Sequence, residues 1–100
     1  MMNGIKHKFH AKVTECDGIK FASKKEATYY KYLKELSDVL FFLRQVPFHL
    51  PGNTTYRADF LVFYRDGTAR VIDVKGFRTE MYKVKKRLVE ALYPIEIEEV

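Results

Sequence analysis

The chain has 100 residues, of which 47% are hydrophobic and 31% are charged, and its formal net charge is +5. This length suits one small domain over residues 1–100, and the basic balance favours a polyanionic partner without identifying it. A single cysteine excludes a disulfide within the chain, and apolar runs of no more than five residues exclude a membrane-spanning helix, so we expect a cytoplasmic protein with no membrane partner.

The first third of the chain predicts a hairpin followed by a helix. Residues 1–10 read as a basic, flexible arm that is either solvated or in contact with nucleic acid. An Asp-Gly pair at positions 17–18 predicts the turn of a hairpin. Ser23, with Glu26 three residues later, forms a capping box, which predicts a helix that ends near residue 37. Its inward stripe would consist of Ala27, Tyr30, Leu33 and Leu36.

The rest of the chain predicts three strands, a helix and a last short strand. The strands are expected over residues 39–50, 57–64 and 69–75, with a loop over residues 51–56. Pro47 favours an edge position or a bulge for the first of them. The second helix should run from about residue 79 to residue 93, with a last strand over residues 95–100. Its apolar stripe would consist of Met81, Val84, Leu88 and Leu92.

Both faces of the two central strands are mostly apolar. One face carries Leu61, Phe63 and Val71, and the other carries Phe60, Val62, Ile72 and Val74. A sheet that is apolar on both faces needs cover on both, which two helices can supply. The sequence therefore predicts an α/β fold with a mixed central sheet flanked by helices and an N-terminal β-hairpin.

Three charged side chains interrupt this apolar pattern, namely Asp59, Asp73 and Lys75. Two acids near the ends of adjacent strands indicate a magnesium site, because carboxylate oxygens are the ligands that magnesium prefers. The lysine could orient a water or neutralise charge in a transition state. Glu26 is available as a further carboxylate. Two alternatives stay open: an ion pair between Lys75 and either acid, and a glutamate that only caps its helix.

The motifs that contain these residues resemble a known group of nucleases. "ADF", then "DVK" fourteen positions on, with a helical glutamate in "FASKKEA" before them, is similar to the PD-(D/E)XK superfamily, although Ala58 stands where that motif has proline. The predicted element order also resembles its restriction-endonuclease-like αβββαβ core. "GIKFASKKEATYY", "YRADF", "DVKG" and T-x-x-Y-x-x-K look like a family of small phage and prophage proteins that resemble Holliday-junction resolvases, from about Gly18 to the C-terminus.

The resemblance implies a magnesium- or manganese-dependent endonuclease that hydrolyses DNA in a bacterial host or phage-infected cell. Asp59 and Asp73 would bind the metal ion with the Val74 carbonyl, and Glu26 would be a further ligand, directly or through water. Lys75 would position or activate the attacking water. Size and family likeness favour branched DNA, above all a Holliday junction, and a homodimer with one site on each side of it. The alternatives are a nicking, nonspecific or transposase-like endonuclease, or a nucleic-acid-binding module without catalysis.

Further basic and polar residues are candidates for the site or for DNA contacts. Lys85, on the stripe of the second helix, either extends its amine to solvent or is a second catalytic or phosphate-binding lysine, as the phage family's pattern implies. Gln45 matches a frequently polar position on the preceding strand. Phosphate contacts, rather than base contacts, are expected from Lys6, Lys8, Lys12, Lys24, Arg78, Lys83, Lys86 and Arg87.

The turn at residues 65–67 decides whether the two acids can meet. A two-residue turn would place Asp59 and Asp73 on opposite faces of the sheet. A three-residue loop would place them directly opposite each other, with Lys75 on the same face. Opposed side chains lie about 4.5–5.5 Å apart at Cβ, close enough to share a metal ion. We therefore predict the three-residue loop, or a bulge that restores the same parity.

Overall fold

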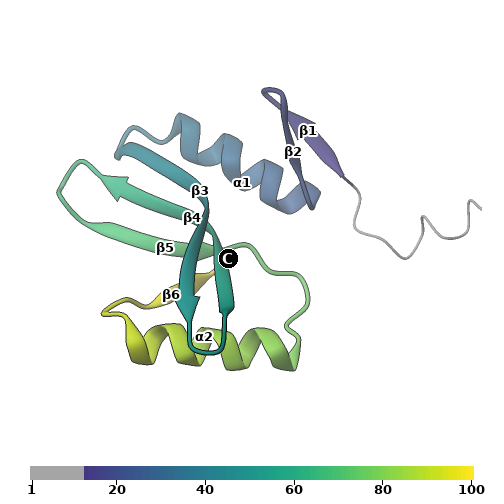
Figure 1. Ribbon diagram of the computed structural model, residues 1–100. Helices are drawn as coiled ribbons and strands as arrows, with labels where there is room; N and C mark the ends of the chain where they lie inside the picture. The colour runs from purple at the N-terminus through teal and green to yellow at the C-terminus, as the bar shows by residue number, and fades with distance from the viewer. Residues whose placement is uncertain (1–12) are drawn as a thin grey trace, which may run out of the picture. The chain divides into compact units, whose positions relative to one another are not determined.

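In the computed structural model, which describes residues 13–100, the chain forms two compact units that divide between Glu35 and Leu36, and each is described by itself (Figure 1). The N-terminal unit contains β1 (Thr14–Cys16), β2 (Ile19–Phe21) and α1 (Lys24–Glu35). The C-terminal unit contains β3 (Val39–Leu50), β4 (Thr54–Tyr64), β5 (Ala69–Asp73), α2 (Glu80–Leu92) and β6 (Ile97–Glu99).

The N-terminal unit is the predicted hairpin and helix. Asp17 and Gly18 both have positive φ angles, 54° and 76°, as the tight turn of a two-residue hairpin requires. Ser23 caps α1, because its Oγ accepts a hydrogen bond from the backbone N–H of Glu26 at 3.1 Å. The buried side chains of α1 are Glu26, Ala27, Tyr30 and Leu33, which confirms most of the predicted stripe.

The C-terminal unit is built on a mixed four-stranded sheet in the order β3-β4-β5-β6. The first two pairings are antiparallel, and β5 pairs with β6 in parallel after the connection through α2. Pro47 lies on β3, which is an edge strand, as predicted, because proline cannot donate a hydrogen bond to a second neighbour. The coarse prediction of an α/β fold with a mixed sheet and an N-terminal hairpin is confirmed.

The loop between β4 and β5 has the predicted length of three residues. The backbone N–H of Gly67 donates to the carbonyl of Tyr64 at 3.0 Å, and the N–H of Tyr64 donates to the carbonyl of Thr68 at 2.8 Å. Gly67 has a φ of 92°, the left-handed conformation that ends a type I turn in such a loop. This loop sets the register of the two central strands.

The loop between β3 and β4 is shorter than predicted. We expected it over residues 51–56, but Leu50 already pairs with Thr54. Gly52 and Asn53 have positive φ angles, 78° and 56°, and this left-handed backbone turns the chain within three residues. The strand therefore begins at Thr54 rather than at residue 57.

The β3–β4 ribbon bends in its middle, as Figure 1 shows. Gln45 on β3 has a φ of 52°, and the pairing passes over it, from Arg44 with Phe60 to Val46 with Ala58. Ala58 and Leu61 contribute to the same hydrophobic cluster although they are three residues apart. Alternate residues of a regular strand share a face, so the strand must change faces between these two positions. The bend lies beside Asp59.

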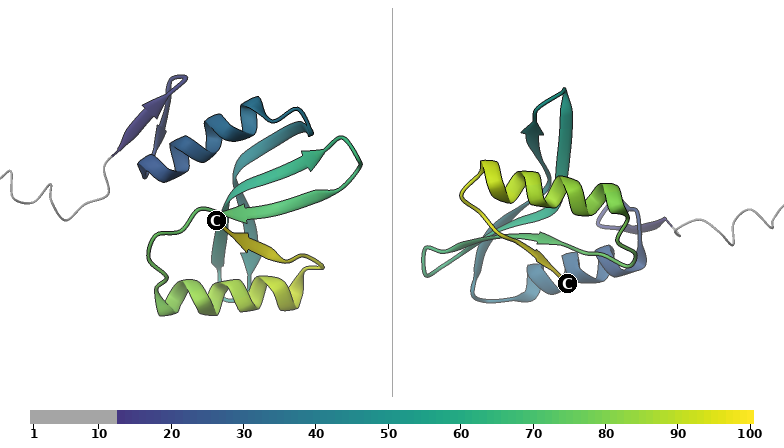
Figure 2. Two further views of the ribbon diagram at one scale, coloured as in Figure 1. Left: turned by 180° about the vertical axis from the view of Figure 1, so that it is seen from behind. Right: turned by 90° about the horizontal axis from the view of Figure 1, so that it is seen from below.

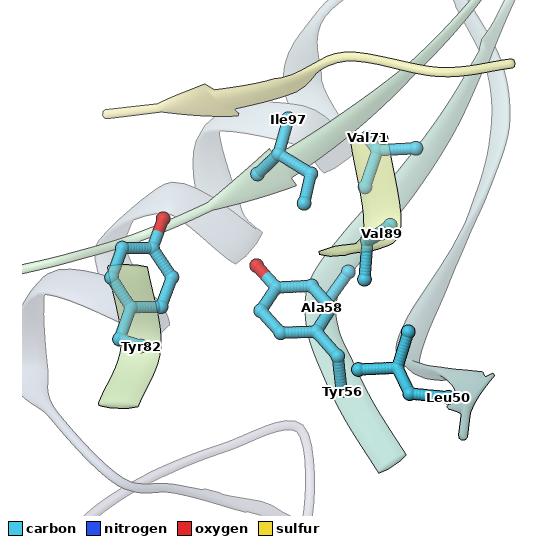
Figure 3. Close-up of a cluster of buried hydrophobic side chains, with 7 residues drawn as sticks. All are labelled: Leu50, Tyr56, Ala58, Val71, Tyr82, Val89 and Ile97. Carbon is cyan, nitrogen blue, oxygen red and sulfur yellow. The ribbon is translucent and has the colours of Figure 1, made fainter. Parts of the chain in front are cut away.

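α2 packs against one face of the sheet (Figure 2) and runs between the predicted ends, with Thr79 as N-cap and Tyr93 as C-cap. The buried core on this face, drawn in Figure 3, consists of Leu50, Tyr56, Ala58, Val71, Tyr82, Val89 and Ile97. The other face of the central strands is also buried, at Phe60, Val62 and Ile72. Within residues 13–100, no helix is long and apolar enough to cross a membrane.

The inward face of α2 differs from the predicted one. The side chains that the sequence placed in the core are exposed: Met81, Val84, Leu88 and Leu92. Tyr82 and Val89 are buried in their place, and the hydroxyl of Tyr82 donates to Glu99 at 2.7 Å. The predicted and the observed stripes are one residue apart. Tyr82 takes the buried position because its aromatic ring packs in the core while its hydroxyl has a hydrogen-bond partner.

Candidate active site

The register of β4 and β5 brings the two predicted acids together. Phe60 pairs with Ile72, so one pair further along Asp59 lies opposite Asp73. The backbone N–H of Asp59 donates to Oδ1 of Asp73 at 3.0 Å, and the N–H of Val74 donates to Oδ2 of Asp59 at 2.8 Å. Each carboxylate is thus held by the backbone of the other strand, and the prediction that the acids meet is confirmed.

Asp73 is fully buried, with 0% of its surface exposed. Its second oxygen, Oδ2, has no hydrogen-bond partner within the part of the chain that the structure describes. Burial raises the pKa of the Asp73 carboxyl, while the charge of Lys75 and the N–H of Asp59 oppose that rise. An unpartnered buried carboxylate oxygen costs free energy, so this position favours a proton or a cation at Oδ2.

Asp59 is half-buried at the bend of the β3–β4 ribbon. Its Oδ1 accepts a hydrogen bond from Nε2 of Gln45 at 3.3 Å. Gln45 makes this contact from a left-handed backbone conformation at the bend of β3. The residue that forms the bend therefore also orients the Asp59 carboxylate. Gln45, which the sequence suggested as a polar position, therefore contacts one member of the acid pair.

Lys75 follows Asp73 by two residues and is half-buried. Its Nζ lies 4.5 Å from the centre of the Tyr82 ring, a cation–π contact, and its backbone N–H donates to the carbonyl of Val100 at 3.2 Å. Its charge lowers the pKa of Asp73, so the two groups share one neighbourhood. α2 and the end of the chain together position the amine.

The donor set suits a metal ion that keeps part of its water shell. Within residues 13–100, no group of three histidine, cysteine or acidic side chains is arranged to hold a metal ion. The two carboxylates would be the donors in this unit, together with the Val74 carbonyl that the resemblance implies, and magnesium commonly takes one or two carboxylates together with several waters. The free Oδ2 of Asp73 is the atom that most needs such a ligand. Glu26 is buried, at 4% exposed, but belongs to the N-terminal unit, so its role as a ligand stays a prediction.

Lys85 lies in a pocket beside the acid pair rather than in open solvent. Its Nζ donates to the carbonyl of Thr55 at 3.4 Å, and the side chain is half-buried. The pocket, of about 230 Å³, is also lined by Lys75 and by Arg57. No sequence pattern distinguishes Arg57, although "YRADF" places it two residues before Asp59, because an exposed arginine on a strand is common.

The other predicted phosphate contacts have different environments. Lys6, Lys8 and Lys12 lie outside the described residues. Lys24 and Arg87 are exposed. Three others form ion pairs within the chain: Arg78 and Lys86 with Glu99, and Lys83 with Glu80. A phosphate would have to compete with these carboxylates.

The fold and the site define an α/β protein with two acids and a lysine gathered where the middle of β4 lies beside the end of β5. The chain belongs to the family described as "Protein of unknown function (DUF1064)", whose family model matches residues 6–98. A search of the curated proteins found no match, and neither did a search of the solved structures. The description of this family names no activity, so the function has to be inferred from the site.

Proposed function

We propose that this chain is a metal-dependent DNA endonuclease of the PD-(D/E)XK type. The observation that carries the proposal is the buried Oδ2 of Asp73, which has no hydrogen-bond partner among the described residues and lies beside Asp59. Lys75 follows Asp73 by two residues. A structural ion pair would give that oxygen a partner. The order α1-β3-β4-β5-α2-β6 supports the proposal, because it is the order expected of the αβββαβ core.

Each residue of the site has a chemical task in this proposal. A magnesium or manganese ion, when bound, would supply a Lewis acid for the phosphate and make a water molecule more acidic. Asp59 and Asp73 would hold that ion, with the Val74 carbonyl and, by the resemblance, Glu26. Lys75 would position the attacking water and neutralise charge that develops on the phosphate. Gln45 would keep Asp59 in place.

The favoured substrate is branched DNA, above all a four-way Holliday junction in a bacterial or phage-infected cell. This choice rests on the resemblance and on the small, basic chain, with its formal net charge of +5. A nicking, nonspecific or transposase-like endonuclease uses the same site on other DNA. A nucleic-acid-binding module without catalysis is the alternative from another class, and it needs no metal ion.

The test is cleavage of labelled linear duplex, single strand, flap and four-way junction, each with magnesium, manganese or a chelator. We expect cleavage of the junction with either metal and none with the chelator. Asp73→Asn serves as the inactive control, and Asp38→Asn, an exposed acid of the same charge, as the active one. If the wild-type protein binds these DNAs but cuts none of them with either metal, the binding module is correct and the nuclease is wrong.

A further inference from the structure

The pocket next to the acid pair is cationic. Its charged lining residues are Arg57, Lys75 and Lys85, and among residues 13–100 no acidic side chain lines it. The remaining lining residues are Thr55, Tyr56, Thr79, Met81 and Tyr82. Three like charges around a space of about 230 Å³ repel one another, and an anion in that space would offset the repulsion.

The pocket cations differ from their neighbours on α2 in their partners. Within the chain from residue 13 onward, Arg57 and Lys85 form no ion pair, whereas Lys83 and Lys86 each have a carboxylate partner. The amine of Lys85 donates to the carbonyl of Thr55 on β4. Lys75 is held over the ring of Tyr82. Of the lining cations, Arg57 and Lys85 are therefore the two that no acid within residues 13–100 neutralises.

Two further polar features of this pocket favour an anion. Thr79 lines it and is the N-cap of α2, a helix of 13 residues, so the positive end of the helix dipole lies at the pocket. Tyr56 also lines it, is 4% exposed, and has a hydroxyl without a hydrogen-bond partner among the described residues. Figure 3 shows that hydroxyl pointing to the side on which Tyr82, another lining residue, lies.

We propose that this pocket binds a backbone phosphate of the DNA next to the phosphate that is cleaved. The inference rests on the proposed function for the choice of DNA. Lys75 connects the two positions, because it lines the pocket and follows Asp73 by two residues. A water molecule takes up about 30 Å³ of liquid, so the space of about 230 Å³ accommodates a phosphate group with part of its sugar. Arg57 and Lys85 thereby become DNA-positioning residues.

The test measures DNA binding by the full chain in the presence of a chelator, so its outcome does not depend on nuclease activity. Arg57→Gln and Lys85→Gln should each weaken binding of a labelled four-way junction by about five- to tenfold. Each should also make the slope of log affinity against log salt concentration less steep by about 0.9, the value for one phosphate contact. Arg57→Lys, which keeps the charge, should recover most of the affinity.

Arg70→Gln is the matched control, because Arg70 is exposed on β5, pairs with Glu98 and does not line this pocket. It should bind within about twofold of wild type. Equal weakening by Arg70→Gln would show that only net charge matters, and wild-type binding by both pocket variants would overturn the site. Circular dichroism of each variant checks that the chain remains folded.

A competition experiment identifies the source of the phosphate. Inorganic triphosphate, with ionic strength held constant by sodium chloride, should displace the junction only at millimolar concentration. Displacement at micromolar concentration, lost in Arg57→Gln, would identify a free phosphorylated ligand and overturn the assignment to DNA. If the wild-type protein cleaves DNA but the pocket variants bind it as tightly as the wild type does, the nuclease proposal holds and the phosphate-site proposal is wrong.

Discussion

The environment of the Asp73 carboxylate is unusual for a residue with a purely structural role. One of its oxygens accepts a backbone hydrogen bond, and the other is buried with no partner among residues 13–100. Burial raises its pKa, so the stability of the metal-free fold falls as the pH rises from the unfolded to the folded pKa, and the cost is complete above the folded pKa. A bound cation would remove that cost.

Metal ions should therefore stabilise the fold through Asp73. At a concentration of about 100 times its dissociation constant, a ligand of the folded state adds about 2.7 kcal/mol. For a domain of this size each kcal/mol raises Tm by roughly 4–8 °C. We expect magnesium or calcium to raise the Tm of the wild type and of Asp38→Asn, but not of Asp73→Asn, in a thermal melt. An unchanged wild-type Tm at millimolar metal would contradict the site.

Catalysis should depend on Asp73 and Lys75 far more than folding does. A group that acts only in the transition state lowers the turnover when it is removed. We expect Asp73→Asn and Lys75→Ala to lose several orders of magnitude in cleavage rate, with circular dichroism spectra like that of the wild type. Arg70→Ala, which also removes an exposed charge, should keep its rate. Wild-type turnover in either site variant would show that the roles are wrongly assigned.

At the scale of single residues, the sequence predicted the charged side chains that interrupt an apolar pattern. It did not predict Arg57, which interrupts no such pattern. Asp59, Asp73 and Lys75 were predicted because charged side chains are costly in a buried strand. Arg57 occupies an exposed strand position, where arginine is common. Only the pocket that α2 and β4 form around it distinguishes Arg57 from any other surface cation.

At the scale of elements, turn chemistry predicted more than hydrophobic periodicity did. The sequence of residues 65–67 allows a two-residue turn or a three-residue loop, and the loop was predicted because it brings the two acids together. The structure has that loop, with Gly67 left-handed, and it fixes the register of the acids. Periodicity chose the wrong face of α2, because it weighs Met and Leu above Tyr and cannot see the partner of the Tyr82 hydroxyl. The left-handed backbone of Gln45 has no signal in the sequence alone.

The loop that sets this register should be sensitive to substitution of Gly67, whereas the chain after β5 should tolerate substitution of Gly76. Gly67 has a φ of 92°, and a Cβ there would meet no atom within 4 Å, so Gly67→Ala would be strained by its backbone alone. We expect it to lower the free energy of unfolding by about 1 kcal/mol. Gly76→Ala, also in open space and without a positive φ, should unfold at about the same denaturant concentration as wild type. Equal losses at both positions would refute the left-handed turn.

β6 and α2 are joined through Glu99, which should make stability depend on pH. Its carboxylate accepts from the Tyr82 hydroxyl and the Arg78 guanidinium, and these contacts hold its pKa below the ordinary value of 4.5. Because the folded pKa is the lower one, the stabilisation is present above 4.5 and is lost as the pH falls through the folded pKa. Glu99→Gln should unfold more easily at pH 7.

The same variant should also lose less stability than the wild type between pH 7 and acid, as measured by urea unfolding. Part of the dependence should remain, because the pKa of Asp66 is also lowered, by its hydrogen bonds with Thr68. Glu96→Gln, an exposed acid before β6, is the control. A Glu99→Gln protein with the full acid dependence of the wild type would show that this tie contributes nothing.

At the scale of the whole molecule, the sequence predicted the order of the elements almost completely, because each boundary has a local signal. The hairpin turn, the cap at Ser23, the start of the second helix near residue 79 and the edge position of Pro47 all follow from such signals. Assembly with a second chain has no local signal, and it has to be argued from size and from the symmetry of the substrate.

We expect the active form to be a homodimer. A chain of 100 residues buries a limited fraction of its surface, and a second copy would add to it. A four-way junction is two-fold symmetric and must be cut on two strands, which a two-fold dimer can do with one site from each chain. Sedimentation of the protein with a labelled junction, in a chelator to prevent cleavage, should give two chains for each junction at micromolar concentration. One chain for each junction, with cleavage still occurring when metal is restored, would leave the endonuclease but exclude a resolvase that cuts as a dimer.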